Sequence, residues 1–219
     1  MTSKSHLGNT DVDIFSKLPF SQACENNKSA ILTVLQKELQ TAKRVLEIGS
    51  GTGQHSVYFA SKLRQLIWQC SDLPENIRAI QAWHQAYPAP NLPPVLTLDL
   101  TMIDSLAQNK TQLPQYDAIF TANTLHIVPW SLVEQLFSLA AVQLVNFGKL
   151  IIYGPFNEQG QFTSAGNANF DAMLRSRNSQ SGIRDKGKVI TLARQKGFAL
   201  SAQYAMPVNN QMLVFQKTA

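Results

Sequence analysis

The chain has 219 residues, of which 44% are apolar and 15% charged, and its formal net charge is +5. This composition excludes an extensively disordered chain and is typical of one globular domain with a sizeable core. The lysines and arginines are scattered and no three are consecutive, so the positive charge does not indicate a nucleic-acid partner.

The cysteines and the hydrophobic pattern give expectations about the environment of the protein. Cys24 and Cys70 are far apart and lack metal-ligand spacing, so we expect reduced thiols, no disulfide and no metal site. Residues 1–13 lack the apolar core of a signal peptide, and no window reaches the ~20 apolar residues of a membrane span. We therefore expect a cytoplasmic protein without membrane contact.

Residues 1–20 are interpreted as an N-terminal arm and residues 21–219 as the domain. A helix is predicted from Ser21 onward, because the apolar residues at positions 31, 32, 35 and 39 fall on one stripe. The first turn of this helix groups four polar residues, Glu25, Asn26, Asn27 and Lys28. Two interpretations stay open: a solvated helix entrance that Glu25 stabilises through the helix dipole, or a lid that contacts a substrate.

A strand predicted over residues 45–48 runs into glycines at every second position, Gly49, Gly51 and Gly53, before a helix predicted over 54–64. Glycine permits positive φ and lets a ligand lie against the main chain, and the helix N-terminus offers unpaired N–H groups. The pattern favours a nucleotide-like ligand at this turn. An ordinary glycine-rich turn of a sheet protein is the alternative.

An acidic residue follows each of the next two predicted strands, over residues 66–70 and 95–98. Asp72 lies nineteen residues beyond Gly53, about where a βαβ unit places the carboxylate that binds ribose hydroxyls. Asp72 could equally cap the next helix. The apolar stripe of that helix is Ile77, Ile80, Trp83 and Tyr87. Asp99 follows the third strand, at the sheet edge where α/β proteins bind ligands.

A fourth strand, predicted over residues 116–120, leads to Asn123 and His126 at the same sheet edge. His126 has two interpretations, a structural hydrogen-bonding histidine or a residue that contacts substrate, because imidazole can donate, accept or titrate. After this strand, Ser131 and Glu134 form a capping box that predicts the start of an amphipathic helix.

A fifth strand is predicted over residues 150–153, and a long polar loop follows it to about residue 167. Loops of this length in compact domains are frequently functional. The candidates in this loop are Phe156, Phe162, Thr163 and Ser164. Beyond it, a helix is predicted over residues 186–196, and residues 199–205 and 211–217 predict an antiparallel hairpin.

The glycine spacing and the hairpin distinguish between two nucleotide-binding folds. Residues 49–54 lack the G-x-G-x-x-G pattern of dinucleotide-binding dehydrogenases. The stretch over residues 46–53 instead resembles the first motif of the class I S-adenosylmethionine-dependent methyltransferases, and the resemblance covers residues 44–219. It implies a Rossmann-like α/β fold with a seven-stranded sheet in the order 3-2-1-4-5-7-6, an antiparallel last strand and helices on both faces.

The resemblance also implies a cofactor, S-adenosylmethionine, and the residues that bind it. Asp72 resembles the ribose-binding acid, Asp99 and Leu100 resemble the adenine-contacting pair, and Asn123 resembles the residue that closes the methionine side. The implied cofactor-binding residues are Glu47, Gly49, Ser50, Gly51, Thr52, Gly53, Asp72, Asp99, Leu100 and Asn123.

The chain is also similar to an uncharacterised methyltransferase-like family of small single-domain proteins, known mainly as a domain of unknown function. The similar segments are residues 19–28, 49–60, 153–184 and 206–217. Within them the points of likeness are residues 25–28, 154–156, 162–164, 167, 169–171, 182–185, 206–207 and 209–210. This similarity favours a role of the polar turn in the site. It implies no substrate, because the family is defined by its cofactor fold.

We interpret the chain as an S-adenosylmethionine-dependent methyltransferase whose small-molecule acceptor the sequence does not identify. The candidate catalytic residues are His126, Glu25 and Tyr153, and the candidate substrate residues are Asn26, Asn27, Lys28, Phe156, Thr163 and Asn209. A non-catalytic protein that binds S-adenosylmethionine or a partner is the alternative. A nucleic-acid methyltransferase is less favoured, because residues 123–126 lack the Pro-Pro-aromatic arrangement that holds an exocyclic amine.

Overall fold

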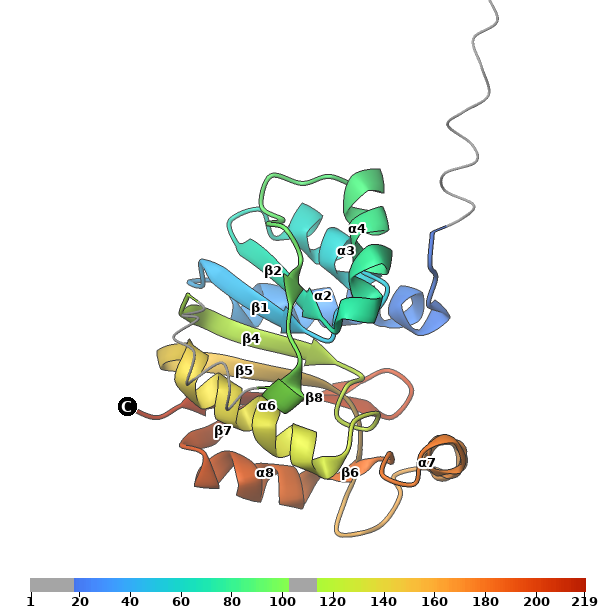
Figure 1. Cartoon of the computed structure of the whole chain (residues 1–219). Coiled ribbons are helices and arrows are strands. Elements are labelled where there is room, and N and C mark those ends of the chain that lie inside the picture. Colours follow the sequence, from blue (N-terminus) through green and yellow to red (C-terminus); the bar gives the residue numbers. More distant parts are fainter. Residues whose placement is uncertain (1–17, 103–113) are drawn as a thin grey trace, which may run out of the picture.

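The computed structural model describes residues 18–102 and 114–219. The N-terminal arm expected over residues 1–20 therefore lies almost entirely outside the described residues. The described chain forms layers of helices around one central sheet (Figure 1). Among the helices of these described segments, none has the length and apolar character needed to cross a membrane.

The sheet has the strand order β3-β2-β1-β4-β5-β8-β7, and a short β6 pairs with β5 outside this path. The strands are β1 Arg44–Ile48, β2 Ile67–Asp72, β3 Leu96–Thr97, β4 Tyr116–Ala122, β5 Leu144–Asn157, β6 Arg184–Asp185, β7 Phe198–Met206 and β8 Asn210–Lys217. β1 to β5 pair in parallel, whereas β8 is antiparallel to both β5 and β7. Apart from the additional β6, this confirms the predicted order and the antiparallel last strand.

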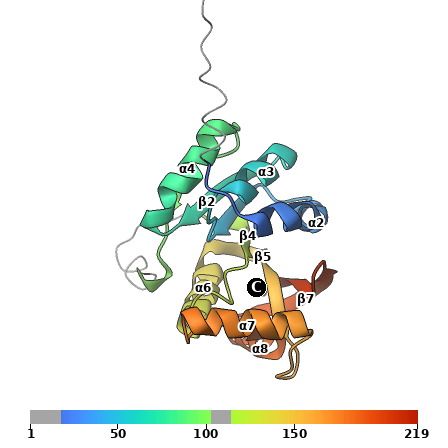
Figure 2. The same cartoon turned by 90° about the vertical axis from the view of Figure 1, so that its right-hand side faces the viewer.

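Helices cover both faces of the sheet (Figure 1). They are α2 Gln22–Glu38, α3 Gln54–Lys62, α4 Ile77–Ala86, α6 Trp130–Gln143, α7 Ala165–Arg177 and α8 Lys186–Gln195, with short 3-10 turns η1 Pro74–Asn76 and η2 Leu100–Met102. Side chains of α2, α3 and α4 join one core cluster, and those of α6 and α8 join the other. Figure 2 shows α7 lying across one end of the domain, below α2.

The strand β5 shows why the two clusters lie on opposite faces. Leu150 and Ile152 belong to one cluster, whereas Ile151 and Tyr153 belong to the other. Successive side chains of a strand point to opposite faces, so a continuous apolar run fills both cores at once. Such runs are typical of parallel strands that are covered on both sides.

The strand β5 is also longer than the predicted residues 150–153, because two later segments pair with its end. β8 pairs with it as far as Pro155, and β6 pairs with Phe156 and Asn157. The prediction that Phe156 lies in a binding loop is therefore wrong. Its side chain is 1% exposed and packs in the core.

Two predictions about helices are also wrong. The helix α6 begins at Trp130 after the N-cap Pro129, without a side-chain cap, so Ser131 and Glu134 do not form a capping box. In α4, only Ile80 of the predicted apolar stripe is buried. Trp83 of this stripe is half-buried and donates its indole N–H to the carbonyl of Pro19 at 2.7 Å, so it contacts the N-terminal segment.

Candidate functional site

A cavity of about 1120 Å³ lies at the carboxyl ends of the parallel strands. Its lining comes from the segments that follow β1 to β5, the first turns of α2 and α7, and the β7–β8 turn. The predicted site residues that line it are Asn26, Asn27, Gly49, Ser50, Gly51, Thr52, Asp72, Asp99, Leu100, Asn123, His126, Tyr153 and Asn209. Ligands of open α/β sheets bind at this end of the strands, so the topology itself assembles the cavity.

The turn after β1 presents its main chain to the cavity. The N–H groups of Gly49 and Ser50 both donate to the carbonyl of Ser71, at 3.0 and 3.1 Å, which fixes the turn against β2. Gly49 has a φ of 73°, and a Cβ there would lie 2.8 Å from Thr124 Oγ1. Gly51 has a φ of 60°, and a Cβ there would meet no described atom within 4 Å. The open space at Gly51 is where a ligand can approach the backbone.

Two residues of the glycine motif stand behind this turn and do not line the cavity. A Cβ at Gly53 would lie 2.9 Å from the Cα of Ile80, so Gly53 permits the close packing of α3 on α4. The Glu47 carboxylate is buried and accepts a hydrogen bond from Trp68 Nε1 at 2.9 Å. Burial raises the pKa of Glu47 to about 7, and the nearby charge of Asp72 adds to this rise.

The Asp72 carboxylate joins the ends of β1 and β2 and lines the cavity. Its Oδ2 accepts the N–H of Gly51 at 2.6 Å. Its Oδ1 accepts the N–H of Leu73 at 2.7 Å and the side-chain amide of Asn76 at 2.8 Å. Asp72 therefore holds the turn before η1 and lines the cavity, but it is not a helix N-cap, because the N-cap residues of η1 and α4 are Leu73 and Asn76.

Asp99, Leu100 and Asn123 contribute the neighbouring parts of the lining. Asp99 Oδ1 accepts hydrogen bonds from the N–H and the hydroxyl of Thr101, at 2.8 and 2.7 Å. Asn123 has a φ of 60°, a conformation that asparagine adopts more readily than most residues, and its N–H donates to the carbonyl of Tyr153 at 2.9 Å. The end of β4 is thereby tied to β5 beside the cavity.

The polar first turn of α2 presents two different faces. Asn26 and Asn27 line the cavity, and Asn27 Oδ1 lies 2.7 Å from Nε2 of the buried His55. Glu25 and Lys28 form an ion pair with each other away from the lining, and the Lys28 ammonium lies 4.9 Å from the centre of the Tyr58 ring. Only one half of the predicted polar turn therefore faces the cavity.

Two buried aromatic side chains can exchange hydrogen bonds with a ligand in the cavity. The His126 imidazole is 5% exposed and packs edge-on against Phe170, with 5.2 Å between ring centres. Burial lowers the pKa of His126 to about 4, with a contribution from the charge of Arg184, so the ring is neutral at pH 7. Burial raises the pKa of Tyr153, so its phenol stays protonated.

The segment 181–184 holds the loop that carries His126. Arg184 donates to the carbonyls of Leu125 and Val128, at 2.9 and 2.5 Å. The N–H of Gly182 donates to the carbonyl of His126 at 2.9 Å. Ser181 Oγ donates to the carbonyl of Ile127 at 2.6 Å. Four consecutive carbonyls are thus satisfied by one segment. This arrangement leaves the loop little freedom to move alone.

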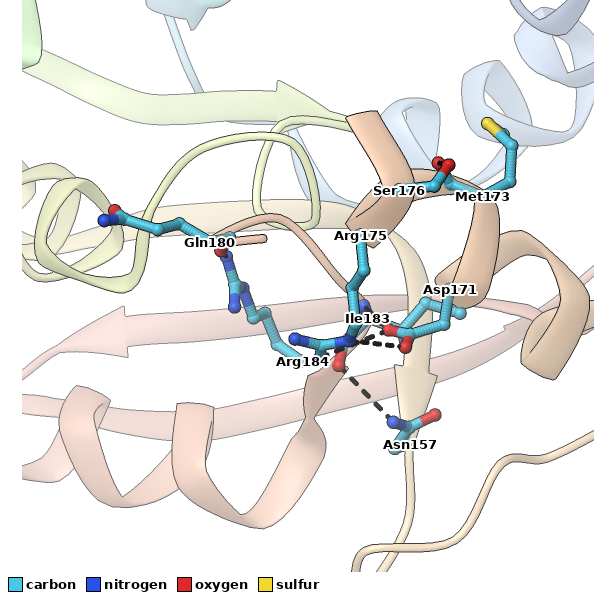
Figure 3. A network of polar contacts seen from close by, with 8 residues as sticks. All are labelled: Asn157, Asp171, Met173, Arg175, Ser176, Gln180, Ile183 and Arg184. Carbon is cyan, nitrogen blue, oxygen red and sulfur yellow. Dashed lines mark hydrogen bonds and ion pairs between the residues drawn. The ribbon is translucent and has the colours of Figure 1, made fainter. Parts of the chain in front are cut away.

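The helix α7 is attached to the same segment through Asp171 (Figure 3). Asp171 Oδ1 accepts the N–H of Ile183 at 2.6 Å, and its Oδ2 accepts Nε of Arg175 at 2.7 Å. Asn157, at the end of β5, donates its side-chain amide to the carbonyl of Ile183 at 3.4 Å. The network connects α7, β5 and the His126 loop into one unit.

The cavity lining also includes residues that the sequence analysis did not select as site residues. They include His55, Asn167, Phe170, Val208 and Asn210. Thr163, which was selected, lies outside the lining and its Oγ1 accepts the side-chain amide of Asn167 at 2.8 Å. The shared family segments around these positions were the available signal, but the sequence did not tell which residue of each segment faces inward.

A cation site is not evident at the cavity. Within residues 18–102 and 114–219, no three His, Cys, Asp or Glu side chains are grouped so that they could hold a metal ion.

The Cys24 thiol lines the cavity, and burial raises its pKa. It therefore stays protonated at neutral pH and is a poor nucleophile.

The described architecture is shared with solved methyltransferase structures. An O-methyltransferase family protein from Burkholderia thailandensis superposes with a TM-score of 0.71 at 16% identity, covering 88% of this chain and 58% of that chain. Human N-acetylserotonin methyltransferase in complex with SAM gives 0.73 at 14% identity, covering 90% and 53%. An O-methyltransferase family 2 protein from Planctomyces limnophilus, in complex with apigenin, gives 0.68 at 12% identity, covering 87% and 62%.

These likenesses concern the fold, since the identities are low and the chain spans little more than half the length of these three proteins. The family assignment comes from the sequence. The family described as "Protein of unknown function (DUF938)" matches residues 18–217, nearly the whole described chain. The protein therefore belongs to the DUF938 family, and its fold is that of the class I S-adenosylmethionine-dependent methyltransferases.

Proposed function

We propose that this protein transfers a methyl group from S-adenosylmethionine to a small-molecule acceptor. The observation that carries the proposal is the contact between Gly51 and Asp72: the glycine N–H donates to a cavity-facing carboxylate while the glycine itself leaves open space. A glycine turn that binds a dinucleotide would have the spacing G-x-G-x-x-G, which residues 49–54 lack. The cavity also has room for a cofactor together with a small acceptor, because ligand pockets measure roughly 300–1,000 Å³.

The residues at the β1 to β3 side of the cavity fit the parts of this cofactor. Asp72 carries acceptor oxygens for the hydroxyl groups of the cofactor's ribose. Asp99 and the apolar Leu100 are the residues that we propose to contact its adenine base. The main chain at Gly51 can lie directly against a ligand. Ser50, Thr52 and Asn123 supply polar groups toward the methionine part. Glu47 is behind the turn, and we assign it the role of supporting the turn rather than direct contact.

When bound, S-adenosylmethionine supplies an electrophilic methyl group on a sulfur that leaves with the carbon–sulfur electron pair. The chain must then orient the acceptor atom and exclude water, and such positioning can contribute on the order of 7–11 kcal/mol in favourable cases. Asn27, Asn123, Tyr153 and Asn209 are the residues that we propose for orientation. Tyr153 acts as a protonated phenol that donates a hydrogen bond.

His126 is the residue that we propose to take the proton released by a hydroxyl or amine acceptor. Its ring lines the cavity and is neutral at pH 7, so it has a lone pair available. Its ring nitrogens have no hydrogen-bond partner among the described residues, which leaves them open to the acceptor. Glu25, the other candidate base, is paired with Lys28 outside the cavity lining and is not part of this proposal.

Calorimetry with S-adenosylhomocysteine tests the cofactor part of the proposal. We expect the wild type to bind, and Asp72→Asn to bind roughly 10- to 100-fold more weakly, because hydrogen bonds to a charged group contribute about 1.5–3 kcal/mol. Asp117→Asn is the matched control, since Asp117 also accepts two main-chain N–H groups, from Lys43 and Arg44, but lies outside this cavity. A folded wild type that does not bind overturns the proposal.

A methyl-acceptor screen tests the catalytic part. Release of S-adenosylhomocysteine with a small-molecule acceptor is the expected result, and His126→Asn should lower turnover by 10²–10⁴-fold if it removes a general base. Unchanged turnover in the variant removes His126 from that role. Cofactor binding without turnover on any acceptor favours a non-catalytic binding protein instead.

A further inference from the structure

The charged side chains of the cavity are all on one side. Asp72, Glu75 and Asp99 line it after β2 and β3. Among the described lining residues there is no lysine or arginine. The opposite side, formed by α2, α7, the His126 loop and the β7–β8 turn, is the side where an acceptor would lie, and its described lining carries no formal charge at pH 7.

Basic residues of the segments that form that side are engaged in other contacts. Lys28 pairs with Glu25 and lies over the Tyr58 ring. Arg175 pairs with Asp171, and Arg184 donates to the main-chain carbonyls of Leu125, Val128 and Gln180. None of these three cations lines the cavity.

The two histidines of the cavity do not provide a positive charge either. Burial lowers the pKa of both His55 and His126 to about 4. The first turns of α2 and α7 are each capped: Ser21 Oγ accepts the N–H of Cys24 in α2, and Ser164 Oγ accepts the N–H of Asn167 in α7. An anion at this side would therefore meet no lysine, arginine or charged histidine in the lining.

The acceptor side instead offers amides and apolar groups. The asparagines that line this side are Asn26, Asn27, Asn123, Asn167, Asn209 and Asn210, whereas the remaining lining asparagine, Asn76, lies in η1 on the other side. An asparagine side chain both donates and accepts hydrogen bonds, so this set suits hydroxyl, carbonyl or amide groups. Ile127, Leu132, Phe170 and Pro155 add apolar surface between the amides.

We propose that the acceptor is an uncharged molecule with hydrogen-bonding groups and an aromatic or aliphatic part, and that the acceptor side of the cavity rejects carboxylates and phosphates. The proposal rests on the methyltransferase function proposed above. Its physical basis is that an anion moved into a site without a paired cation loses solvation that nothing replaces. The carboxylates of the cofactor side increase this penalty.

The test measures the binding of matched probes to the protein saturated with S-adenosylhomocysteine. One pair is 4-hydroxyacetophenone and 4-hydroxybenzoate, which have similar shapes and differ in charge at pH 7. Ligand-observed NMR titration should show that the ketone binds and that the carboxylate binds at least about tenfold more weakly, a difference of about 1.4 kcal/mol.

A charge-introducing variant sharpens the test. Gly166 lines the cavity in the first turn of α7, and a Cβ there would meet only Ser164 Oγ, at an ordinary 3.7 Å. Gly166→Lys should raise the affinity for 4-hydroxybenzoate by at least about tenfold relative to the ketone. Ala172→Lys adds the same charge on the exposed side of α7 and should leave both affinities unchanged.

The outcomes separate this inference from the function on which it rests. Failure of the wild type to bind S-adenosylhomocysteine overturns the proposed function. If that ligand binds but 4-hydroxybenzoate binds as tightly as the ketone, or the ketone does not bind, the inference of an uncharged acceptor is overturned and the cofactor assignment stands.

Discussion

The Nε of Arg184 donates to the main-chain carbonyl of Leu125 at 2.9 Å, across 59 residues of sequence. Arg184 also donates to the main-chain carbonyl of Val128, so this residue of β6 is hydrogen-bonded to both ends of the loop that carries His126. Because Ile183 is bound in turn by Asp171 of α7, the helix that covers the cavity and the proposed base are positioned by the same segment. We therefore expect the proposed acceptor side of the cavity to be preorganised.

The first prediction concerns Arg184. Arg184→Gln removes its charge and most of its donors, so the free energy of unfolding should fall by about 1–3 kcal/mol as buried carbonyls lose their partners. The pKa of His126 should rise, because the Arg184 charge contributes to its lowering. Denaturant unfolding measures the first effect, and an NMR titration of the imidazole measures the second.

Two further variants serve as controls for Arg184. Arg184→Lys keeps the charge but not the planar fork, so it should lower stability while leaving the His126 pKa close to that of the wild type. Arg177→Gln, on the exposed last turn of α7, should change neither quantity. An unaltered His126 titration in folded Arg184→Gln contradicts the electrostatic part of the prediction.

The fold was predictable because its signals are local. The apolar runs of β1, β2 and β4, the glycine turn and the terminal hairpin each lie within a few consecutive residues. The end of β5 was not predictable in this way, because Phe156 becomes part of a strand only through pairing with Arg184. Nothing next to Phe156 in the sequence reports that distant partner.

The candidate site shows a similar division. Asp72, Asp99 and Asn123 follow strands, and parallel strands bring their carboxyl ends together, so their common location was predictable. The turn of Glu25 to Lys28 is polar throughout, and polarity does not tell which face of a helix turns inward. Only the packing of Asn27 on His55 and of Lys28 on Tyr58 separates the two faces.

A second prediction concerns Gly51. Gly51→Ala places a Cβ in open space but at a φ of 60°, so the variant should fold and lose only about 1–2 kcal/mol of stability. Its affinity for S-adenosylhomocysteine should fall by at least about tenfold because the methyl group occupies the space of the ligand. Calorimetry and thermal unfolding check the two parts.

Gly160→Ala is the matched control for this change. Gly160 has a φ of 76° and equally open space around its Cα, but it lies outside the cavity. It should lose similar stability and keep full affinity. Equal affinity loss in both variants, or none in Gly51→Ala, contradicts the placement of the cofactor against Gly51.

A third prediction uses the raised pKa of Glu47, which shifts from 4.5 to about 7. Between these values the folded protein keeps a proton that the unfolded chain has released, so the contribution of Glu47 to stability decreases as the pH rises from 4.5 to 7. Glu47→Gln removes this dependence. At pH 8 the variant should be more stable than the wild type by up to roughly 3 kcal/mol, and below pH 4.5 the difference should disappear.

Urea unfolding at a series of pH values measures the difference between wild type and variant. The buried histidines titrate in both proteins, so their effect cancels in this comparison. A difference between wild type and Glu47→Gln that stays constant over this pH range contradicts the prediction.

The last prediction concerns Val208 in the β7–β8 turn. Val208 lines the cavity, is 83% exposed and has a φ of 58°, a conformation that is unfavourable for a β-branched residue. Val208→Gly should relieve this strain and stabilise the protein by about 1 kcal/mol. If the side chain contributes to acceptor binding, the variant should also bind 4-hydroxyacetophenone more weakly.

Phe147→Gly separates these two effects of the Val208 change. Phe147 has a comparable φ of 63° and is also exposed, but it lies outside the cavity of the site. Relief of strain should stabilise this variant as well, which thermal unfolding measures. Its affinity for 4-hydroxyacetophenone, measured by NMR titration, should equal that of the wild type. Unchanged probe binding in Val208→Gly would restrict Val208 to a role in the turn. Weaker binding in that variant alone indicates that the strained conformation is retained because it places an apolar side chain at the acceptor side of the cavity.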